Sequence, residues 1–153
     1  MNRYTFNQGS IETLELIGSL WEKLRQVHAA STVHFPERYE AMNWHDRKQS
    51  LIDKSIALHV EYATDKDSGQ LVGYCISSVE KEATTGEVDS LFVDEPYRKT
   101  GLGEELFSRS INWLDEQQVE VQRLSVSVGN EVVLDFYKRF DFYPLHIILQ
   151  RKK

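Results

Sequence analysis

A run of basic residues and glycines, "RKTGLGEEL", lies where an apolar, strand-like stretch meets an amphipathic helix. The first turn of a helix leaves backbone N–H groups without partners and carries a partial positive charge. An anion placed there satisfies both, and Gly101 and Gly103 lack the Cβ atoms that would keep it away. Arg98 and Lys99 add formal positive charge. This spacing predicts a phosphate or pyrophosphate site, with an ordinary strand-to-helix turn as an equal alternative.

Two other phosphate loops do not fit this stretch. The dinucleotide-binding fingerprint needs a third glycine three residues after the second, and Leu106 occupies that position. The Walker loop needs Gly-Lys-Ser/Thr after a four-residue gap, and the stretch lacks it. A phosphate site here therefore has to belong to a different fold.

Two carboxylates precede the glycines on one predicted strand. Glu87 and Asp89 are two residues apart in "EVDSLFV", so their side chains point to the same face. A carboxylate in that position can take a proton from an amine, directly or through water. An alkyl ammonium has a pKa of about 10.4, so making it neutral near pH 7 costs roughly 4–5 kcal/mol. The alternative is that both residues are exposed at the edge of the strand.

The other reactive side chains show no pattern of a site. The five histidines lack metal-ligand spacing, so no metal is expected: His28, His34, His45, His59 and His146. Cys75 lies in the apolar stretch "GYCIS", which favours a small core residue over a nucleophile. The tryptophans are interpreted as packing anchors, and Trp44 with Phe35 and Tyr39 is an alternative lining for an acceptor site.

Composition excludes several classes of function. The 153 residues are 41% hydrophobic and 27% charged, as in ordinary globular domains. The net charge of −6 argues against nucleic acid as a partner and is compatible with a cationic substrate. No apolar run reaches the roughly 20 residues of a membrane span. One cysteine and the absence of an apolar signal region in "MNRYTFNQGS" predict a cytoplasmic protein.

The hydrophobic pattern predicts a single domain over residues 1–153, in the order strand, two helices, three strands, helix, strand, helix, strand. Strands are expected at 3–6, 58–62, 71–79, 87–93, 121–128 and 143–150. Helices are expected from Ser10 to about His28, from Asp46 to about Ile56, at 101–117 and at 131–140 after Asn130, with 31–44 a loop or broken helix. Hairpin-linked strands followed by a β-α-β crossover imply an α+β fold with a mixed, mostly antiparallel sheet.

Several motifs together resemble the GNAT acyl-coenzyme-A N-acyltransferases. "RKTGLG" is similar to the family signature Arg/Gln-x-x-Gly-x-Gly/Ala, and "LFV" ends five residues before its arginine. "GNEVVLDFYKRFDF" looks like the family's Asn-containing helix, with Asn130 and Tyr137 at the usual seven-residue spacing. Asp141 stands where the family usually has glycine. The resemblance extends from the first strand to the last and implies a twisted sheet that splays between its fourth and fifth strands, flanked by about four helices.

The resemblance implies that acetyl-CoA enters the gap between "EVDSLFV" and "RLSVSVG". Backbone groups of Leu91, Phe92 and Val93 would pair with the pantetheine arm like an added strand. The pyrophosphate would bind to the amides of the signature loop: Arg98, Lys99, Thr100, Gly101, Leu102, Gly103 and Glu104. Asn130, Phe136 and Tyr137 would complete the cofactor site.

The resemblance also implies the catalytic roles. Tyr137 matches the family's general acid, whose phenol stays protonated at neutral pH; core packing beside Phe136 and Phe140 is the alternative. Glu87 matches a catalytic glutamate of some members, and Asp89 is the second candidate for the base. The amine would attack the thioester without a covalent enzyme intermediate, and backbone N–H groups near Leu91 would stabilise the developing oxyanion.

The acceptor stays open at this stage. A small cationic amine suits the acidic balance, and a peptide or protein amine suits the catalytic residues equally well. The rival interpretations are a non-catalytic acyl-CoA-binding or sensing module and a pure interaction domain. The residues leave the oligomeric state open, and the resemblance implies a homodimer.

Overall fold

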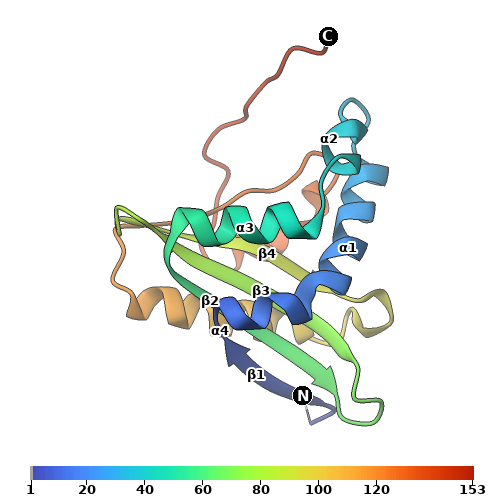
Figure 1. Cartoon of the computed structure of the whole chain (residues 1–153), viewed down its shortest axis with the longest axis vertical. Coiled ribbons are helices and arrows are strands. Elements are labelled where there is room, and N and C mark those ends of the chain that lie inside the picture. The colour runs from blue at the N-terminus through green and yellow to red at the C-terminus, as the bar shows by residue number, and fades with distance from the viewer. Residues whose placement is uncertain (1) are drawn as a thin grey trace.

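A computed structural model describes residues 2–153 and contains one five-stranded sheet between two layers of helices (Figure 1). The strands lie in sequence order: β1 (Tyr4–Gly9), β2 (Ser55–Asp65), β3 (Leu71–Glu80), β4 (Thr85–Val93) and β5 (Val121–Leu124). The first three neighbouring pairs are antiparallel, and β4 with β5 is parallel. The predicted α+β fold with a mixed, mostly antiparallel sheet is confirmed.

Five α-helices surround the sheet: α1 (Leu14–Ser31), α2 (Pro36–Glu40), α3 (Trp44–Lys54), α4 (Leu102–Glu116) and α5 (Leu134–Lys138). Helices α1 and α3 cover one face, and α4 covers the other (Figure 1). The short α2 lies inside the stretch expected to be a loop or broken helix. The helix predicted at 131–140 is shorter, because residues 131–133 form a 3-10 turn before α5.

The core consists of two apolar clusters, one on each face of the sheet. Ile17 and Trp21 of α1 pack with Tyr74 of β3 on one face. Phe107 of α4 packs with Cys75 on the other. Because both faces are covered, β3 is buried at consecutive residues instead of at alternate ones. Burial raises the pKa of the Cys75 thiol to about 12, which suits the packing role expected for it.

Two helix starts differ from the predicted ones. Helix α3 begins after Asn43, not at Asp46: the Asp46 N–H donates to Asn43 Oδ1 at 2.9 Å, and Asn43 Nδ2 donates to Asp46 Oδ2 at 2.9 Å. The predicted cap is therefore wrong: Asp46 is the third residue of the helix, and Asn43 is its cap. Ser10 makes no capping bond, because its Oγ donates to the Leu58 carbonyl at 2.7 Å.

Replacing Asn43 with alanine should lower the free energy of unfolding by about 1 kcal/mol, because the first turn of α3 loses its acceptor. Urea denaturation measures this loss. Ser50→Ala is the control, since Ser50 is exposed in the middle of the same helix. An equal effect of both substitutions would contradict the capping role.

The final predicted strand is wrong for the described structure. Residues 143–150 form no strand, and every one of them is exposed. In the same way, β5 ends at Leu124 where the pattern predicted a strand to 128. Both segments lack a neighbouring strand to pair with, and a β-strand needs one for its backbone hydrogen bonds. Across residues 2–153, the structure has no helix that is long and apolar enough to cross a membrane; the cytoplasmic location stays a prediction.

Candidate active site

Strands β4 and β5 separate halfway along their length. Their parallel pairing runs from Thr85 opposite Val121 to Val88 opposite Leu124 and stops there. Asp89 follows as an extra residue, because Val88 and Ser90 face consecutive residues of β3. Such a bulge bends the strand that carries it, so the rest of β4 turns away from the chain after Leu124. The splay between the fourth and fifth strands, expected from the resemblance, is confirmed.

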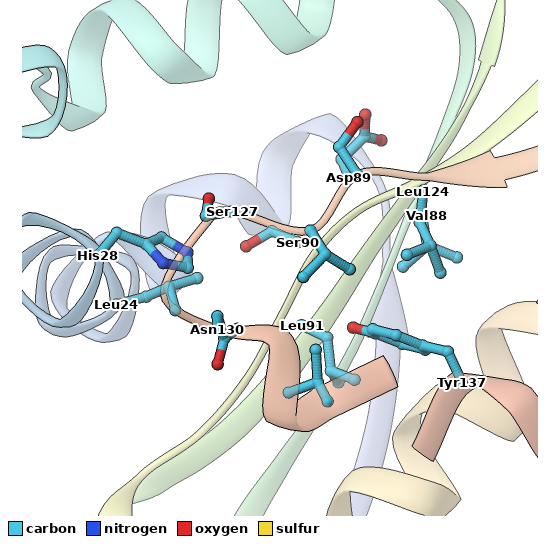
Figure 2. Close-up of a pocket in the computed structure, with 13 residues that line it drawn as sticks. Leu24, His28, Val88, Asp89, Ser90, Leu91, Leu124, Ser127, Asn130 and Tyr137 are labelled. Carbon is cyan, nitrogen blue, oxygen red and sulfur yellow. The ribbon is translucent and has the colours of Figure 1, made fainter. Parts of the chain in front are cut away.

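A cavity of about 70 Å³ lies where these two segments diverge (Figure 2). The bulged part of β4 forms one wall, and residues 124–127 form another. Leu24 and His28 of α1 close a third side, and Tyr137 of α5 points its hydroxyl inward (Figure 2). Elements from both ends of the chain therefore meet at one small space that holds several polar groups.

The Tyr137 ring is fixed by aromatic packing. Its centroid lies 5.3 Å from that of Phe107 and 5.3 Å from that of Phe136. Burial raises the pKa of the Tyr137 phenol well above its ordinary value. The hydroxyl is therefore protonated at neutral pH and can donate a hydrogen bond to a group in the cavity.

The two candidate carboxylates share one ammonium. Lys54 Nζ contacts Asp89 Oδ1 closely and lies 3.6 Å from Glu87 Oε1, so both side chains are on the same side of β4. Ser78 Oγ donates to Asp89 Oδ2 at 2.6 Å, and Glu87 also lies 3.7 Å from Arg123 Nε. Only Asp89 lines the cavity.

Burial makes Asp89 a stronger base than an ordinary aspartate. Its side chain is 0% exposed, and burial raises its pKa although Lys54 and Ser78 act in the opposite direction. A higher pKa strengthens a carboxylate as a proton acceptor at neutral pH. The geometry thus favours Asp89 over Glu87, the reverse of the order that the resemblance gave.

His28 is a cavity residue that the sequence did not single out. Its Nδ1 is buried and has no hydrogen-bond partner among the residues described. The ring packs on Tyr39 at 5.3 Å, and Tyr39 in turn donates to Ser127 Oγ at 2.7 Å. Burial lowers the pKa of His28, so the ring is neutral at pH 7. The signals in the sequence were its position at the end of the apolar stripe of α1 and, from the resemblance, its place in the N-terminal helical region expected to shape the acceptor pocket.

The two glycines of the signature loop have different reasons to be glycine. Gly101 is the N-cap of α4 with φ 85°, a left-handed conformation that suits glycine whatever binds nearby. A Cβ atom on Gly103, in contrast, would meet only Val93 Cγ2 at 3.6 Å, an ordinary contact. Packing therefore does not require glycine at 103, which is compatible with the predicted clearance for a phosphate.

The first turn of α4 presents free backbone donors. The first N–H with a partner inside the helix is that of Glu105, which donates to the Gly101 carbonyl at 3.1 Å. This leaves the amides of Leu102, Gly103 and Glu104 available, and no side chain caps them. Arg98, exposed beside them, donates from Nε to the Val93 carbonyl at 2.9 Å. A pyrophosphate fits this combination of donors and charge.

The other predicted cofactor residues lie around the same gap. Asn130 stands at the N-cap of the turn before α5 but makes no capping bond, and its side chain lines the cavity instead (Figure 2). Leu91 lines the cavity as well, whereas Phe92 is 6% exposed and faces the core. Phe136 packs against Phe107 at 5.7 Å. Asp141 adopts φ 65°, so it accommodates the left-handed turn where the family usually has glycine.

Thr100 and Glu104 of the signature loop, and Trp44 of the alternative acceptor site, make contacts away from the cavity. Thr100 Oγ1 donates to the Tyr97 carbonyl at 2.8 Å, and Glu104 forms an ion pair with Arg139 at 3.1 Å. Trp44 is not at the cavity: its indole N–H donates to the Leu14 carbonyl at 3.2 Å, and it packs against Trp21. Among residues 2–153 no three His, Cys, Asp or Glu side chains are grouped to hold a metal ion.

Comparisons with known proteins agree with this arrangement. A putative acetyl transferase from Pyrococcus furiosus has the same fold at 19% identity, with a TM-score of 0.72 over 97% of this chain and 98% of that one. An aminoglycoside N-acetyltransferase solved with CoA has a TM-score of 0.62 at 15% identity over 98% and 94%. An uncharacterised N-acetyltransferase of Methanocaldococcus jannaschii is 30% identical over 73 residues, 48% of this chain and 32% of that relative.

The chain therefore aligns with about a third of the length of that curated relative. The sequence pattern described as "Acetyltransferase (GNAT) family" matches residues 21–142, which include β4, the signature loop, the cavity and Tyr137. That match covers well over half of the 153 residues. This chain belongs to the acetyltransferase (GNAT) family.

Proposed function

We propose that this chain is an N-acetyltransferase that transfers acetyl from acetyl-CoA directly to a primary amine. The observation that carries the proposal is the cavity at the divergence of β4 and β5, which brings a protonated phenol and a buried carboxylate into one space. Direct transfer to an amine needs one group to accept a proton and one to donate a proton. Tyr137 and Asp89 provide this pair.

The charge of acetyl-CoA suits the basic residues and free amides at the end of the gap. The residues that would hold it are the backbone of Leu91–Val93 for the pantetheine arm and the amides of Leu102–Glu104 for the pyrophosphate, with Asn130 and Phe136 beside the arm. When bound, it supplies an acetyl group activated as a thioester. Arg98 and Lys99 add attraction for the phosphates.

Asp89 accepts the proton of the acceptor ammonium, directly or through a water molecule. Lys54 and Ser78 each bond one of its carboxylate oxygens, which fixes the orientation of the group. Tyr137, on the α5 side of the cavity, donates its proton to the departing sulfur. Neutral His28 accepts a hydrogen bond from the amine and orients it toward the carbonyl carbon.

Asp89→Asn should lower kcat roughly a hundredfold or more, because the amide accepts no proton. The acid limb of kcat/KM should also disappear in this variant. In the unmodified enzyme that limb should lie above the ordinary carboxyl range, since burial raises the pKa of Asp89 and activity requires its charged form. Steady-state rates from pH 5 to 9 measure both effects.

Glu87→Gln is the matched control, because Glu87 contacts the same lysine from outside the cavity. We expect it to change kcat only a few-fold. If Glu87→Gln abolishes the acid limb and Asp89→Asn keeps it, Glu87 is the general base and Asp89 is not.

The acceptor we infer is a small cationic amine. The support is the small cavity, the net charge of −6 and the fold shared with an aminoglycoside N-acetyltransferase, and a peptide or protein amine is the alternative. Release of free thiol from acetyl-CoA with a panel of polyamines, aminoglycosides and peptides tests both. Tight coenzyme A binding without turnover on any amine would favour the sensing module instead. We also infer that two copies of the chain form a homodimer.

A further inference from the structure

We propose that this chain has a second ligand pocket, which binds a small organic cation of the guanidinium or amidinium type. The pocket is an open hollow of about 390 Å³ between the end of β1 and the last turns of α4. Its lining includes Gln8, Glu12, His59, Trp113 and Glu116, and we call it the Trp113 hollow. It shares no lining residue with the cavity at Asp89. Its volume is in the usual range of small-molecule sites.

Two stacked rings form one wall of the Trp113 hollow. The rings of His59 and Trp113 lie 4.9 Å apart at an angle of 10°. His59 Nε2 lies 3.0 Å from Glu61 Oε1, and with the carboxylate as acceptor this nitrogen carries the proton. Nδ1 of the same ring makes no hydrogen bond among residues 2–153, and in the neutral ring it is an acceptor. The wall therefore offers an acceptor and an indole, the aromatic ring that attracts cations most strongly.

Negative charge surrounds the hollow. Glu12 and Glu116 are exposed at its rim, and in the part of the chain that the structure describes no lysine or arginine lines it. Behind the wall, Glu61 is 5% exposed and lies opposite Gln8 in the ladder between β1 and β2. Within residues 2–153 its only ion-pair partner is His59. A carboxylate in such a buried position attracts a nearby cation more strongly than an exposed one does.

One helical turn earlier, α4 holds a guanidinium against β1. The Arg109 guanidinium carbon lies 4.4 Å from the centroid of the Phe6 ring, and Arg109 Nε lies 2.9 Å from Glu105 Oε1. Two residues further along β1 and four further along α4, the same two faces reach Gln8 and Trp113. The Trp113 hollow thus has the aromatic and acidic parts of the Arg109 contact, and its described lining has no guanidinium.

A planar, delocalised cation fits these groups better than a metal ion or a simple ammonium. Among the described residues, no three His, Cys, Asp or Glu side chains are grouped to hold a metal ion. A guanidinium or amidinium donates several hydrogen bonds in one plane and can lie along an aromatic ring. An ammonium has no flat face and is more strongly hydrated. Carboxylates at the rim and an aromatic wall therefore select the planar cation.

Benzamidine tests the proposal, with benzamide as its neutral analogue of nearly the same shape. In proton–nitrogen NMR spectra of the full chain, benzamidine should shift the indole N–H signal of Trp113 until the site is saturated. Benzamide should require a concentration at least about tenfold higher. The indoles of Trp21 and Trp44 are internal controls, because both pack in the core cluster on the α1 face of the sheet. The spectrum of Trp113→Phe assigns the signal.

Two charge variants test the rim of the hollow. Glu12→Gln and Glu116→Gln should each raise the Kd for benzamidine roughly threefold, the scale of one exposed ion pair. Asp115→Asn is the matched control, because it removes the same charge from the neighbouring residue, whose Oδ1 accepts from Gln122 Nε2 at 2.8 Å outside the hollow. It should leave the Kd unchanged. Circular dichroism should show that all three variants are folded.

Three results would overturn the proposal. The first is a Trp113 signal that stays in place with benzamidine up to about 10 mM, or that benzamide shifts equally well. The second is an equal effect of Asp115→Asn and Glu116→Gln. The third is a shift that disappears with saturating coenzyme A or in Asp89→Asn, because the cation then binds at the cavity. None of these measurements depends on acetyl transfer, so the proposed activity stands or fails separately.

Discussion

Tyr137→Phe should lower kcat by roughly tenfold or more and leave the Kd for coenzyme A and the free energy of unfolding close to their original values. The substitution removes only the hydroxyl that points into the cavity, while the ring keeps its contacts with Phe107 and Phe136. Without that hydroxyl, the departing thiolate has no protonated neighbour on the α5 side of the cavity. A tenfold change corresponds to about 1.4 kcal/mol of transition-state stabilisation.

Thiol release at saturating acetyl-CoA gives kcat, and calorimetric titration with coenzyme A gives the Kd. Tyr62→Phe is the control, because Tyr62 packs against the core cluster on the α1 face and loses the same atom outside the cavity. An unchanged kcat in the Tyr137 variant, or an equal loss in both variants, would return Tyr137 to a packing role in the aromatic cluster around Phe107.

The sheet could be predicted as far as local periodicity specifies it. The alternation of Leu58, Val60 and Tyr62 with other residues and the mostly apolar stretch 71–79 predict two strands in the right order. The bulge at Asp89 is different, since it exists only in the register between β4 and β3. No local pattern contains that register, so the splay of the sheet followed from the family resemblance alone.

The cavity residues divide in the same way, into those that sequence motifs identify and those that only the folded chain brings together. Asp89 and Tyr137 were identified because the motif spacing identifies their strand and helix. His28 required knowledge of how α1 lies against the segment after β5. This depends on contacts between residues far apart in the chain, such as Tyr39 with Ser127, which are 88 positions apart. The preference of Asp89 over Glu87 likewise comes from burial, which the sequence of a short polar stretch does not reveal.

Residues 143–150 show a third kind of difference between the predicted and the observed structure. Local propensity predicted a strand at residues 143–150, but in the described structure this segment pairs with no strand. A strand depends on its neighbour for hydrogen bonds, whereas a helix such as α4 satisfies most of its own. For this reason the helices of this chain are closer to their predicted positions than its last two strands.

Gly103→Val should raise the Kd for coenzyme A by roughly tenfold to a hundredfold, as expected for the loss of one charge-assisted hydrogen bond of about 1.5–3 kcal/mol. The valine side chain would occupy the space in front of the free amides of the first turn of α4. The free energy of unfolding should change little, because a Cβ at this position meets only Val93 Cγ2 at 3.6 Å. Calorimetric titration and thermal melting without ligand measure the two quantities.

Gly86→Ala is the control, and we expect it to show the opposite pattern to Gly103→Val. A Cβ there would lie 2.7 Å from Leu114 Cδ2, so this variant should lose stability and keep its affinity for coenzyme A. The two glycines thus separate a ligand effect from a packing effect in one experiment. If Gly103→Val binds coenzyme A normally and only melts earlier, the signature loop is an ordinary turn between β4 and α4, and its glycines serve the backbone alone.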